Sequence, residues 1–223
     1  MTFAAAYEDP PRVWGIGRVV VGSEVVPWPV SEPDIDDETE VATGQLRALG
    51  LEADELVLIV SLLSHAIHVA PFERAAGKVG ALYSSADASR FDAFRTASLI
   101  RQLGATVVFG IDVAVLDGLD DLDRELIDVF GPVRSVVAAD ADAYGRLRAA
   151  GLTPGRWLRL GPLSAIALPG DDALTYDATR WQVEATDGEL VVTNLAERLT
   201  PCDRFATGVG GRVLEPGRLE VPA

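Results

Sequence analysis

The sequence predicts an α/β fold in which a mostly parallel sheet flanked by helices is followed by a smaller β-rich lobe. The first observation is an alternation between residues 50 and 160, where apolar runs of strand length and segments of helix length succeed each other at least four times with short links. Such alternation is typical of a parallel sheet with helices on its faces. The second observation is a change near residue 160, after which helical spacing stops and short β segments separated by Gly, Pro and Asp take over.

This change of pattern divides the chain into an irregular β lead-in (1–30), a βα-alternating lobe (31–160) and a β-rich lobe (161–223). The chain has 223 residues and 48% hydrophobic content, enough to bury one substantial core. No stretch of the sequence has the length or composition of a linker between independent domains. We therefore expect one compact domain.

The first two elements of the alternating lobe follow from charge and hydropathy. An acidic stretch at 31–40 opens a helix that extends to about Leu49, because carboxylates suit the N-terminus of a helix and Gly50 is a natural stop. The continuous apolar run at 55–60 (ELVLIV) predicts a strand that is buried on both faces.

The clearest helix of the sequence spans 87–103, because its apolar residues recur at near-helical spacing and Gly104 follows. Another helix is expected over 65–79, with Pro71 near a helix start or at a break. The other elements expected before residue 160 are strands at 81–84, 106–109, 133–138 and 157–160, a helical or turn region at 112–128 and a helix at 142–150. In the β-rich lobe the expected strands are 163–168, 181–185, 189–193 and 212–215.

The composition excludes several classes of function. With 34 acidic and 19 basic residues the net charge is −15, which repels phosphate backbones and anionic lipid, so we expect neither nucleic-acid nor membrane binding. ATP and CoA are also anions and would need a local basic or backbone-amide site.

The single cysteine, Cys202, rules out an internal disulfide, and the sequence shows neither a secretory signal nor an apolar run of membrane-spanning length. We expect a cytoplasmic protein.

The most informative segment is 188–213, which reads GELVVTNLAERLTPCDRFATGVGGRV. It resembles the GELVVTxL…RYRTGDLGRV segment of acyl-adenylate-forming enzymes (acyl-CoA synthetases, adenylation domains and luciferases), and in particular the phenylacetate-CoA ligase branch. Weaker similarities occur in the same order at 46–59 (LRALGLEADELVLI), 77–90 (GKVGALYSSADASR) and 100–116 (IRQLGATVVFGIDVAVL). The resemblance covers roughly 30–215 and implies a truncated relative with the fold of the latter half of these enzymes' large N-terminal domain.

The resemblance also implies which residues adenylation would need. Four features of the family's adenylation machinery are missing or altered in this sequence. Where the family has a phosphate-cradling [ST]SGTTGxPK loop, residues 17–30 contain one Gly-Ser pair and neither threonine nor lysine. Where the family has a magnesium-holding YGxTE glutamate, residues 160–168 offer no carboxylate. The ribose-binding Asp after TG is Val209, and the sequence stops at Ala223, about where the domain with the catalytic lysine would begin. No cofactor is therefore expected, ATP and magnesium least of all, and a CoA or acyl group is left as the candidate ligand.

The resemblance supplies the candidate site residues. His65 matches the histidine of the family's PLFH motif near the acyl pocket, and Arg204 matches the RYRTG motif; both are tentative catalytic residues. Alternatively, His65 is a hydrogen-bonded histidine at a strand–helix junction and Arg204 forms a structural ion pair. His65 and His68 are spaced to share a metal ion, but no third ligand is nearby in the sequence, so no metal is expected. The expected ligand-binding residues are Gly161, Ser164, Thr207, Gly208 and Val209.

Three functions follow as expectations. The first is a degenerate acyl-CoA synthetase-like protein that serves as an accessory or ligand-binding module for an acyl or CoA-type ligand or for a catalytic partner. The second is an active ligase-like or acyltransferase-like enzyme that has repurposed the pocket, with His65 and Arg204 in its site. The third is a structural subunit whose exposed sheet edge or apolar face mediates assembly. We expect a homodimer or another protein partner.

Overall fold

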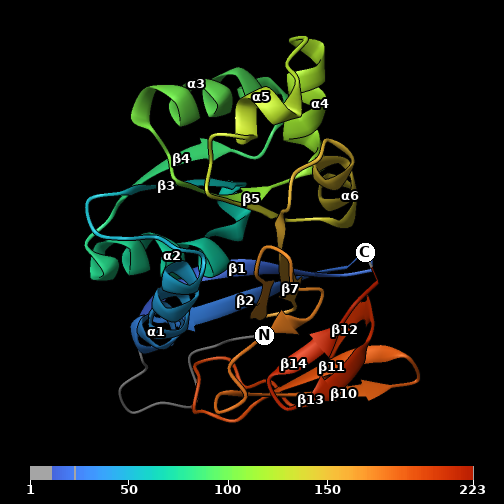
Figure 1. Ribbon diagram of the computed structural model, residues 1–223. Coiled ribbons are helices and arrows are strands. Elements are labelled where there is room, and N and C mark those ends of the chain that lie inside the picture. The colour runs from blue at the N-terminus through green and yellow to red at the C-terminus, as the bar shows by residue number, and fades with distance from the viewer. Residues whose placement is uncertain (1–11, 23, 223) are drawn as a thin grey trace.

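One mixed sheet forms the centre of the fold (Figure 1). The computed structural model describes residues 12–22 and 24–222. Within these residues the sheet contains β3 (Leu56–Ser61), β4 (Leu82–Asp87), β5 (Val107–Ile111), β6 (Ser135–Ala138), β7 (Gly155–Leu160), β8 (Leu163–Ala167), β9 (Leu174–Thr175), β13 (Arg212–Glu215) and β14 (Arg218–Glu220). Their order is β13-β14-β9-β8-β7-β6-β5-β3-β4, and the five strands from β7 to β4 run parallel.

Helices cover both faces of this sheet, as the predicted fold class requires. Among the described residues they are α1 (Glu32–Ala48), α2 (Ala66–Val79), α3 (Ala93–Leu103), α4 (Val113–Asp121), α5 (Leu126–Phe130) and α6 (Ala141–Ala149). Figure 1 shows α1 and α2 on one face and α3 to α6 on the other. The predicted α/β class is thus confirmed. None of the described helices combines the length and the apolar character needed to cross a bilayer.

The apolar run ELVLIV forms the strand with two buried faces that the sequence predicts. In β3, Leu58 and Val60 belong to the apolar cluster under α3 to α6, whereas Val57 and Ile59 belong to the cluster under α1 and α2. All four side chains are fully buried. Successive side chains of a strand point to opposite faces, so a strand between two helical layers needs apolar residues at every position.

α1 begins where the sequence predicts it, at the acidic stretch that follows Ser31. The Ser31 hydroxyl accepts a hydrogen bond from the Asp34 backbone N–H at 3.3 Å, and the Asp34 carboxylate accepts one from the Ser31 backbone N–H at 2.7 Å. This reciprocal capping satisfies two backbone donors at the helix start. Pro71 differs from its prediction, because it lies inside α2 and is buried there. Packing of α2 against the sheet and α1 offsets the backbone hydrogen bond that proline cannot donate.

The expected helix at 87–103 begins later than its spacing suggests. The strand β4 continues to Asp87, a short 3₁₀ turn η2 (Arg90–Asp92) follows, and α3 starts only at Ala93. The Asp92 carboxylate accepts a hydrogen bond from the Asp87 backbone N–H at 2.7 Å and so holds the turn between strand and helix.

The strands of the β-rich part of the chain belong to two different sheets. β8, β9, β13 and β14 extend the large sheet by antiparallel pairing, because a tight turn after Leu160 brings β8 directly alongside β7. Only β10 (Trp181–Thr186), β11 (Glu189–Asn194) and β12 (Phe205–Gly210) form a sheet of their own. The spacing of the sequence did not predict β9, β12 or β14 as strands.

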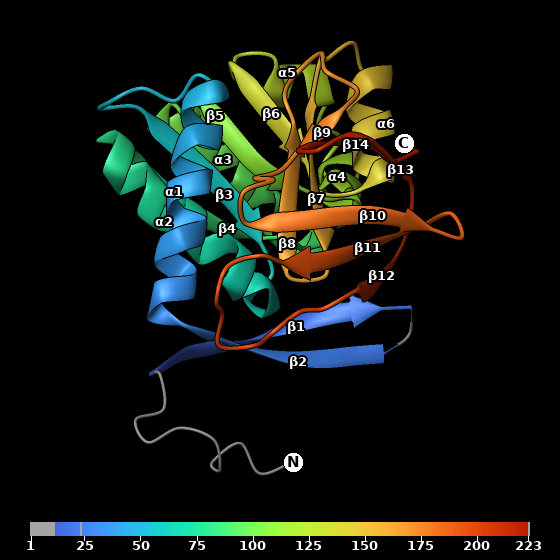
Figure 2. The ribbon, with the colours of Figure 1, turned by 90° about the horizontal axis from the view of Figure 1, so that it is seen from below.

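Within the expected β lead-in, the described residues form an antiparallel hairpin of β1 (Val13–Val21) and β2 (Glu24–Ser31), with a register shift between Val13 and Gly15. Figure 2 shows this hairpin beside β12, with β10 and β11 beyond it. The hairpin, the three-stranded sheet and the β7–β8 hairpin share one apolar cluster, which includes Trp28, Trp181 and Leu190. The two small sheets therefore close over one end of the large sheet.

Candidate functional site

Polar side chains gather where the parallel strands end. His65 follows β3 in the 3₁₀ turn η1 (Leu63–His65), Asp112 follows β5, Asp140 follows β6, and Arg159 lies near the end of β7. β7 pairs with the last residues of β6 and then extends beyond it. Ligands of open α/β sheets bind at the carboxyl ends of the strands, so this is the edge at which a site is expected.

Arg159 is the central group of this cluster. Its Nη1 atom lies 3.2 Å from Nδ1 of His65, and its guanidinium lies over the Trp157 ring, 4.7 Å from the ring centroid. No described carboxylate forms an ion pair with it. Burial lowers the pKa of Arg159, but an arginine stays charged at any pH at which the protein is folded.

Asp112 and Asp140 are occupied as helix caps. Asp112 accepts a hydrogen bond from the Val115 N–H at 3.2 Å, at the start of α4. Asp140 accepts bonds from the Ala143 N–H at 2.7 Å and the Val113 N–H at 2.9 Å. Burial raises the pKa of Asp112, and the nearby Asp140 adds to this effect. These carboxylates act on Arg159 only from a distance, so its positive charge is incompletely balanced.

The two histidines beside Arg159 are neutral. Burial, together with the positive charge of Arg159, lowers the pKa of His65 to about 4 and that of His68 to about 3. Because arginine only donates hydrogen bonds, Nδ1 of His65 accepts and its proton resides on Nε2. A pKa near 4 also makes His65 a weak general base at pH 7. The catalytic role expected for His65 stays a prediction.

The structure brings two predicted site residues together with Arg159, which the sequence did not single out, and with His68, which the sequence analysis considered only as a metal ligand. Ser164 lies opposite Arg159 in the β7–β8 register, and its hydroxyl lies 3.4 Å from Nδ1 of His68. The same hydroxyl accepts a hydrogen bond from the Trp157 indole N–H at 3.3 Å. His65 and Ser164 thus meet around Arg159 and His68. Among the described residues, no three His, Cys, Asp or Glu side chains are arranged to hold a metal ion.

Aromatic packing fills the region around Gly161, where the sequence places a ligand. Gly161 has a left-handed backbone (φ +59°), and a Cβ atom there would lie 2.7 Å from the Phe205 ring. The Phe205 ring in turn packs edge-on against Trp28, with ring centroids 5.5 Å apart. Crevices beside this packing measure only about 20 Å³, the size of a single water molecule.

The residues of the TGVG segment are also engaged in packing. The Thr207 hydroxyl is buried and donates a hydrogen bond to the Leu190 carbonyl at 2.7 Å. Gly208 faces the β1–β2 turn, where a Cβ atom would lie 3.4 Å from the backbone nitrogen of Gly22. Val209 packs against the apolar cluster of the small sheets. This segment therefore supports the fold, and its suggested part in ligand binding stays a prediction.

The β1–β2 connection leaves little space for a phosphate loop. Val21 pairs with Glu24, so only Gly22 and Ser23 lie between the two strands. A loop that wraps phosphates with several backbone amides needs a longer glycine-rich segment. The two residues that connect β1 and β2 are too few for such a loop.

Arg204 lies apart from the histidine cluster. It has a left-handed backbone (φ +49°) and an exposed side chain. Its guanidinium bonds to the Glu184 carboxylate at 2.7 Å and to the Thr186 hydroxyl at 3.3 Å, both on β10. This contact corresponds to the structural ion pair considered as the alternative, and a catalytic role for Arg204 stays a prediction.

Comparison with solved structures places this geometry in a known fold. Scans with protein-family models and with curated protein sequences give no match. A 2-hydroxyisobutyryl-CoA ligase in complex with 2-HIB-AMP and CoA superposes with a TM-score of 0.74 at 11% identity, over 99% of this chain and 58% of the ligase. The protein has the fold of part of an acyl-CoA ligase.

Two further ligases support this assignment of the fold. ATP-bound MatB from Rhodopseudomonas palustris has a TM-score of 0.62 at 15% identity, over 99% of this chain and 50% of MatB. A putative long-chain-fatty-acid CoA ligase from the same organism has a TM-score of 0.62 at 15% identity, over 93% of this chain and 58% of that ligase. The chain thus spans about half the length of these enzymes, 50–58% of each. At such identities the likeness shows the fold alone.

Proposed function

We propose that the protein is an accessory module with the fold of about half an acyl-CoA ligase, which holds an acyl or CoA-type anion without activating it with ATP. The observation that carries the proposal is the filled region around Gly161. The Phe205 ring packs against this glycine, and Gly22, which follows β1, lies against Gly208. A nucleotide needs a cavity of several hundred Å³, and aromatic rings and backbone take its place here. The motif at 188–213 supports a narrower origin, a truncated relative of the phenylacetate-CoA ligase branch.

Arg159 is the proposed anchor for the anion. A guanidinium has five N–H donors, and within the described residues the hydrogen-bond acceptor of Arg159 is His65. Carboxylates and phosphates bind such a group through two parallel hydrogen bonds. The positive charges of Arg159 and Arg18 both act on His65, so this edge is locally cationic in a protein of net charge −15.

An apolar groove beside this anchor can take the acyl part. It has a volume of about 440 Å³, lies at the carboxyl ends of β3 and β4 and includes Leu62, Leu63 and Val69 in its walls. The short turn η1 links the two features, because Leu63 lines the groove and His65 contacts Arg159. A ligand with an anionic head and an apolar tail matches this pair of surfaces.

A ligand titration tests the proposal. We expect a saturating short acyl-CoA or carboxylate to stabilise the protein by about 2.7 kcal/mol at a hundred times its Kd, a rise in Tm of roughly 5–10 °C. ATP with magnesium should produce no shift. Arg159→Gln should weaken acyl-CoA binding by about tenfold or more, because a hydrogen bond to a charged group contributes about 1.5–3 kcal/mol. Differential scanning fluorimetry and calorimetric titration measure both effects.

Arg148→Gln is the matched control, since Arg148 is an exposed arginine on α6 that packs over Tyr144 and lies outside the cluster. It should bind acyl-CoA like the wild type. Stabilisation by ATP with magnesium, or equal acyl-CoA affinity of the Arg159→Gln variant, would overturn the proposal.

A second candidate function, assembly, is favoured by unusually exposed apolar side chains. Leu63 on η1 is 91% exposed and Phe91 on η2 is 98% exposed. They follow β3 and β4, and β4 is an edge strand on which Leu82 and Tyr83 are 64% and 50% exposed. Exposed apolar residues clustered beside an unpaired sheet edge are typical of an interface. We propose a homodimer that covers this surface.

Light scattering coupled to size exclusion tests the dimer. At concentrations of tens of micromolar we expect twice the mass of the chain, and the double variant Leu63→Ser/Phe91→Ser should elute as a monomer, because the replaced side chains lose their apolar contacts. Leu214→Ser on β13 serves as the control, since Leu214 is 45% exposed but lies at the far end of the sheet. A monomeric wild type would exclude the homodimer.

A further inference from the structure

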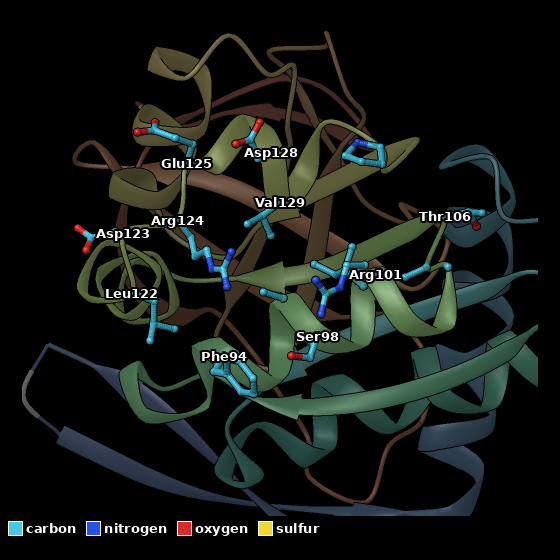
Figure 3. Close-up of a pocket in the computed structure, with 15 residues that line it drawn as sticks. Phe94, Ser98, Arg101, Thr106, Leu122, Asp123, Arg124, Glu125, Asp128 and Val129 are labelled. Atoms are coloured by element: carbon cyan, nitrogen blue, oxygen red, sulfur yellow. The ribbon is translucent and has the colours of Figure 1, made fainter.

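A cavity of about 540 Å³ lies on the side of the sheet opposite α1 and α2, at the amino end of β5 (Figure 3). One wall is α3, and the other is the connection between α4 and α5. Sites for small organic ligands have volumes of about 300–1,000 Å³. Since Arg159 lies at the carboxyl ends of the strands, this cavity is separate from the proposed acyl site.

Two left-handed residues shape the cavity. α3 ends at Leu103 and Gly104 adopts φ +65°, whereas α4 ends at Asp121 and Asp123 adopts φ +51°. Such residues reverse the chain at helix ends. The Arg124 N–H then bonds back to the Leu119 carbonyl at 3.0 Å, which fixes the direction in which Arg124 leaves the backbone.

Two arginines extend into the cavity. Arg101 comes from the last turn of α3 and Arg124 from the α4–α5 connection, and Figure 3 shows both guanidinium groups directed into the space between these walls. The carboxylates of Asp123 and Glu125 point away from that space. Neither arginine forms an ion pair with a carboxylate of the described residues, so their charge is available to a ligand.

The nearby carboxylates of α4 are already paired. Arg146 bonds to Asp117 at 2.7 Å and to Asp120 at 2.6 Å, and Arg90 pairs with Asp121. These contacts bind the acidic side chains of α4 to other arginines. The cavity lining itself also contains the carboxylates of Asp123, Glu125 and Asp128, so an anion there would depend on where the two guanidinium groups point and not on an overall positive charge.

The other walls of the cavity are largely apolar. Phe94 is 62% exposed and Leu122 is 41% exposed, and Ile100, Val129 and Pro132 complete the surface. Ser98 lies below the two arginines in Figure 3 and offers a hydroxyl. Exposed apolar walls with a few convergent polar groups are typical of a site for an organic ligand.

We propose that this cavity binds a small amphipathic anion. Its carboxylate or phosphate lies between Arg101 and Arg124, and its apolar body packs against Phe94 and Leu122. Charge-assisted hydrogen bonds to guanidinium groups select the anionic head, and the apolar walls select a hydrocarbon or aromatic body. Binding in this cavity does not depend on the acyl site proposed for the opposite edge of the sheet.

NMR titration of the ¹⁵N-labelled protein with octanoate, octyl phosphate and octanol tests the site. We expect saturable shifts of the Ser98, Arg101, Gly104 and Arg124 amide resonances with at least one of the two anions. Their relative affinities tell whether a carboxylate or a phosphate is preferred. Octanol, which lacks the charge, should bind about tenfold more weakly or worse. Shifts confined to residues around Arg159, or equal binding of octanol, would overturn the proposal.

The double variant Arg101→Gln/Arg124→Gln should lose about tenfold or more of the anion affinity, and both exposed positions tolerate glutamine. Arg47→Gln is the matched control, since Arg47 is also an exposed arginine in the last turn of a helix, α1. A second variant, Ser98→Trp, should block the cavity and abolish the shifts while leaving acyl-CoA binding at Arg159 intact. Unchanged affinity in the double variant would refute the inference.

Discussion

Gly110→Ala is expected to lower the free energy of unfolding by at least about 3 kcal/mol, because it combines backbone strain with a clash in a fully packed core. Gly110 lies in β5 at a left-handed φ of +92°, where the pairing with β6 shifts register between Phe109 and Ile111. A Cβ atom there would lie 2.3 Å from the Val60 carbonyl oxygen on β3. The backbone of either strand would have to move to accommodate it.

Urea denaturation followed by tryptophan fluorescence measures this loss. Gly44→Ala is the control, because Gly44 lies inside α1 with an ordinary helical backbone, and a Cβ atom there would meet no neighbouring atom within 4 Å. Alanine there should stabilise the protein by about 0.5–1 kcal/mol, as it does inside other helices. Similar effects of the two substitutions would show that the register shift in β5 is not a constraint.

Glu38→Ala is expected to cost about 3–5 kcal/mol, because it leaves a buried cation without its partner. The Glu38 carboxylate accepts hydrogen bonds from Arg198 at 2.6 Å and from the Trp181 indole at 3.2 Å. The side chains of Glu38 and Arg198 are only 16% and 7% exposed, and the guanidinium lies over the Trp181 ring. This contact ties α1 to the three-stranded sheet.

The double substitution Glu38→Leu/Arg198→Met should recover most of the stability, since replacing both charges with apolar groups removes the desolvation cost together with the pair. Glu32→Ala is the control on the same helix. Glu32 pairs with Arg74, and these side chains are 49% and 33% exposed, so its loss should cost less than about 1 kcal/mol. Equal losses from the two alanine substitutions would contradict the expected burial effect.

Local patterns predicted much of the parallel half of the fold. The acidic residues near Ser31 located the start of α1, and the unbroken apolar run of β3 predicted a strand between two helical layers. The sequence does not predict that β8 and β9 join the large sheet whereas β10 and β11 do not. The composition of these short strands is similar, and pairing with a distant strand decides the sheet to which each belongs. β9 contains only Leu174 and Thr175, too short for any period to be detected.

The candidate site was predictable only in part. His65 and Ser164 were found through the family resemblance, whereas Arg159 stood in the sequence as a single cation near the end of an apolar strand. Its importance depends on contacts between residues far apart in sequence, since His65 precedes it by 94 positions. The packing of Phe205 against Gly161 is equally non-local. Contacts between residues so far apart in the sequence depend on the topology of the fold, and they produce no periodic pattern in a single sequence.

The short β1–β2 turn has a consequence for how this protein can change over evolutionary time. Replacing Val209 with aspartate, or Phe205 with a smaller residue, changes side chains only. Gly22 would still lie beside Gly208. Opening a space long enough for phosphates at this point requires inserted residues between the strands. Insertions are rarer than point substitutions, and each intermediate would have to preserve the hairpin. A phosphate loop at this place would therefore need residues inserted between Val21 and Glu24, in addition to any side-chain substitutions.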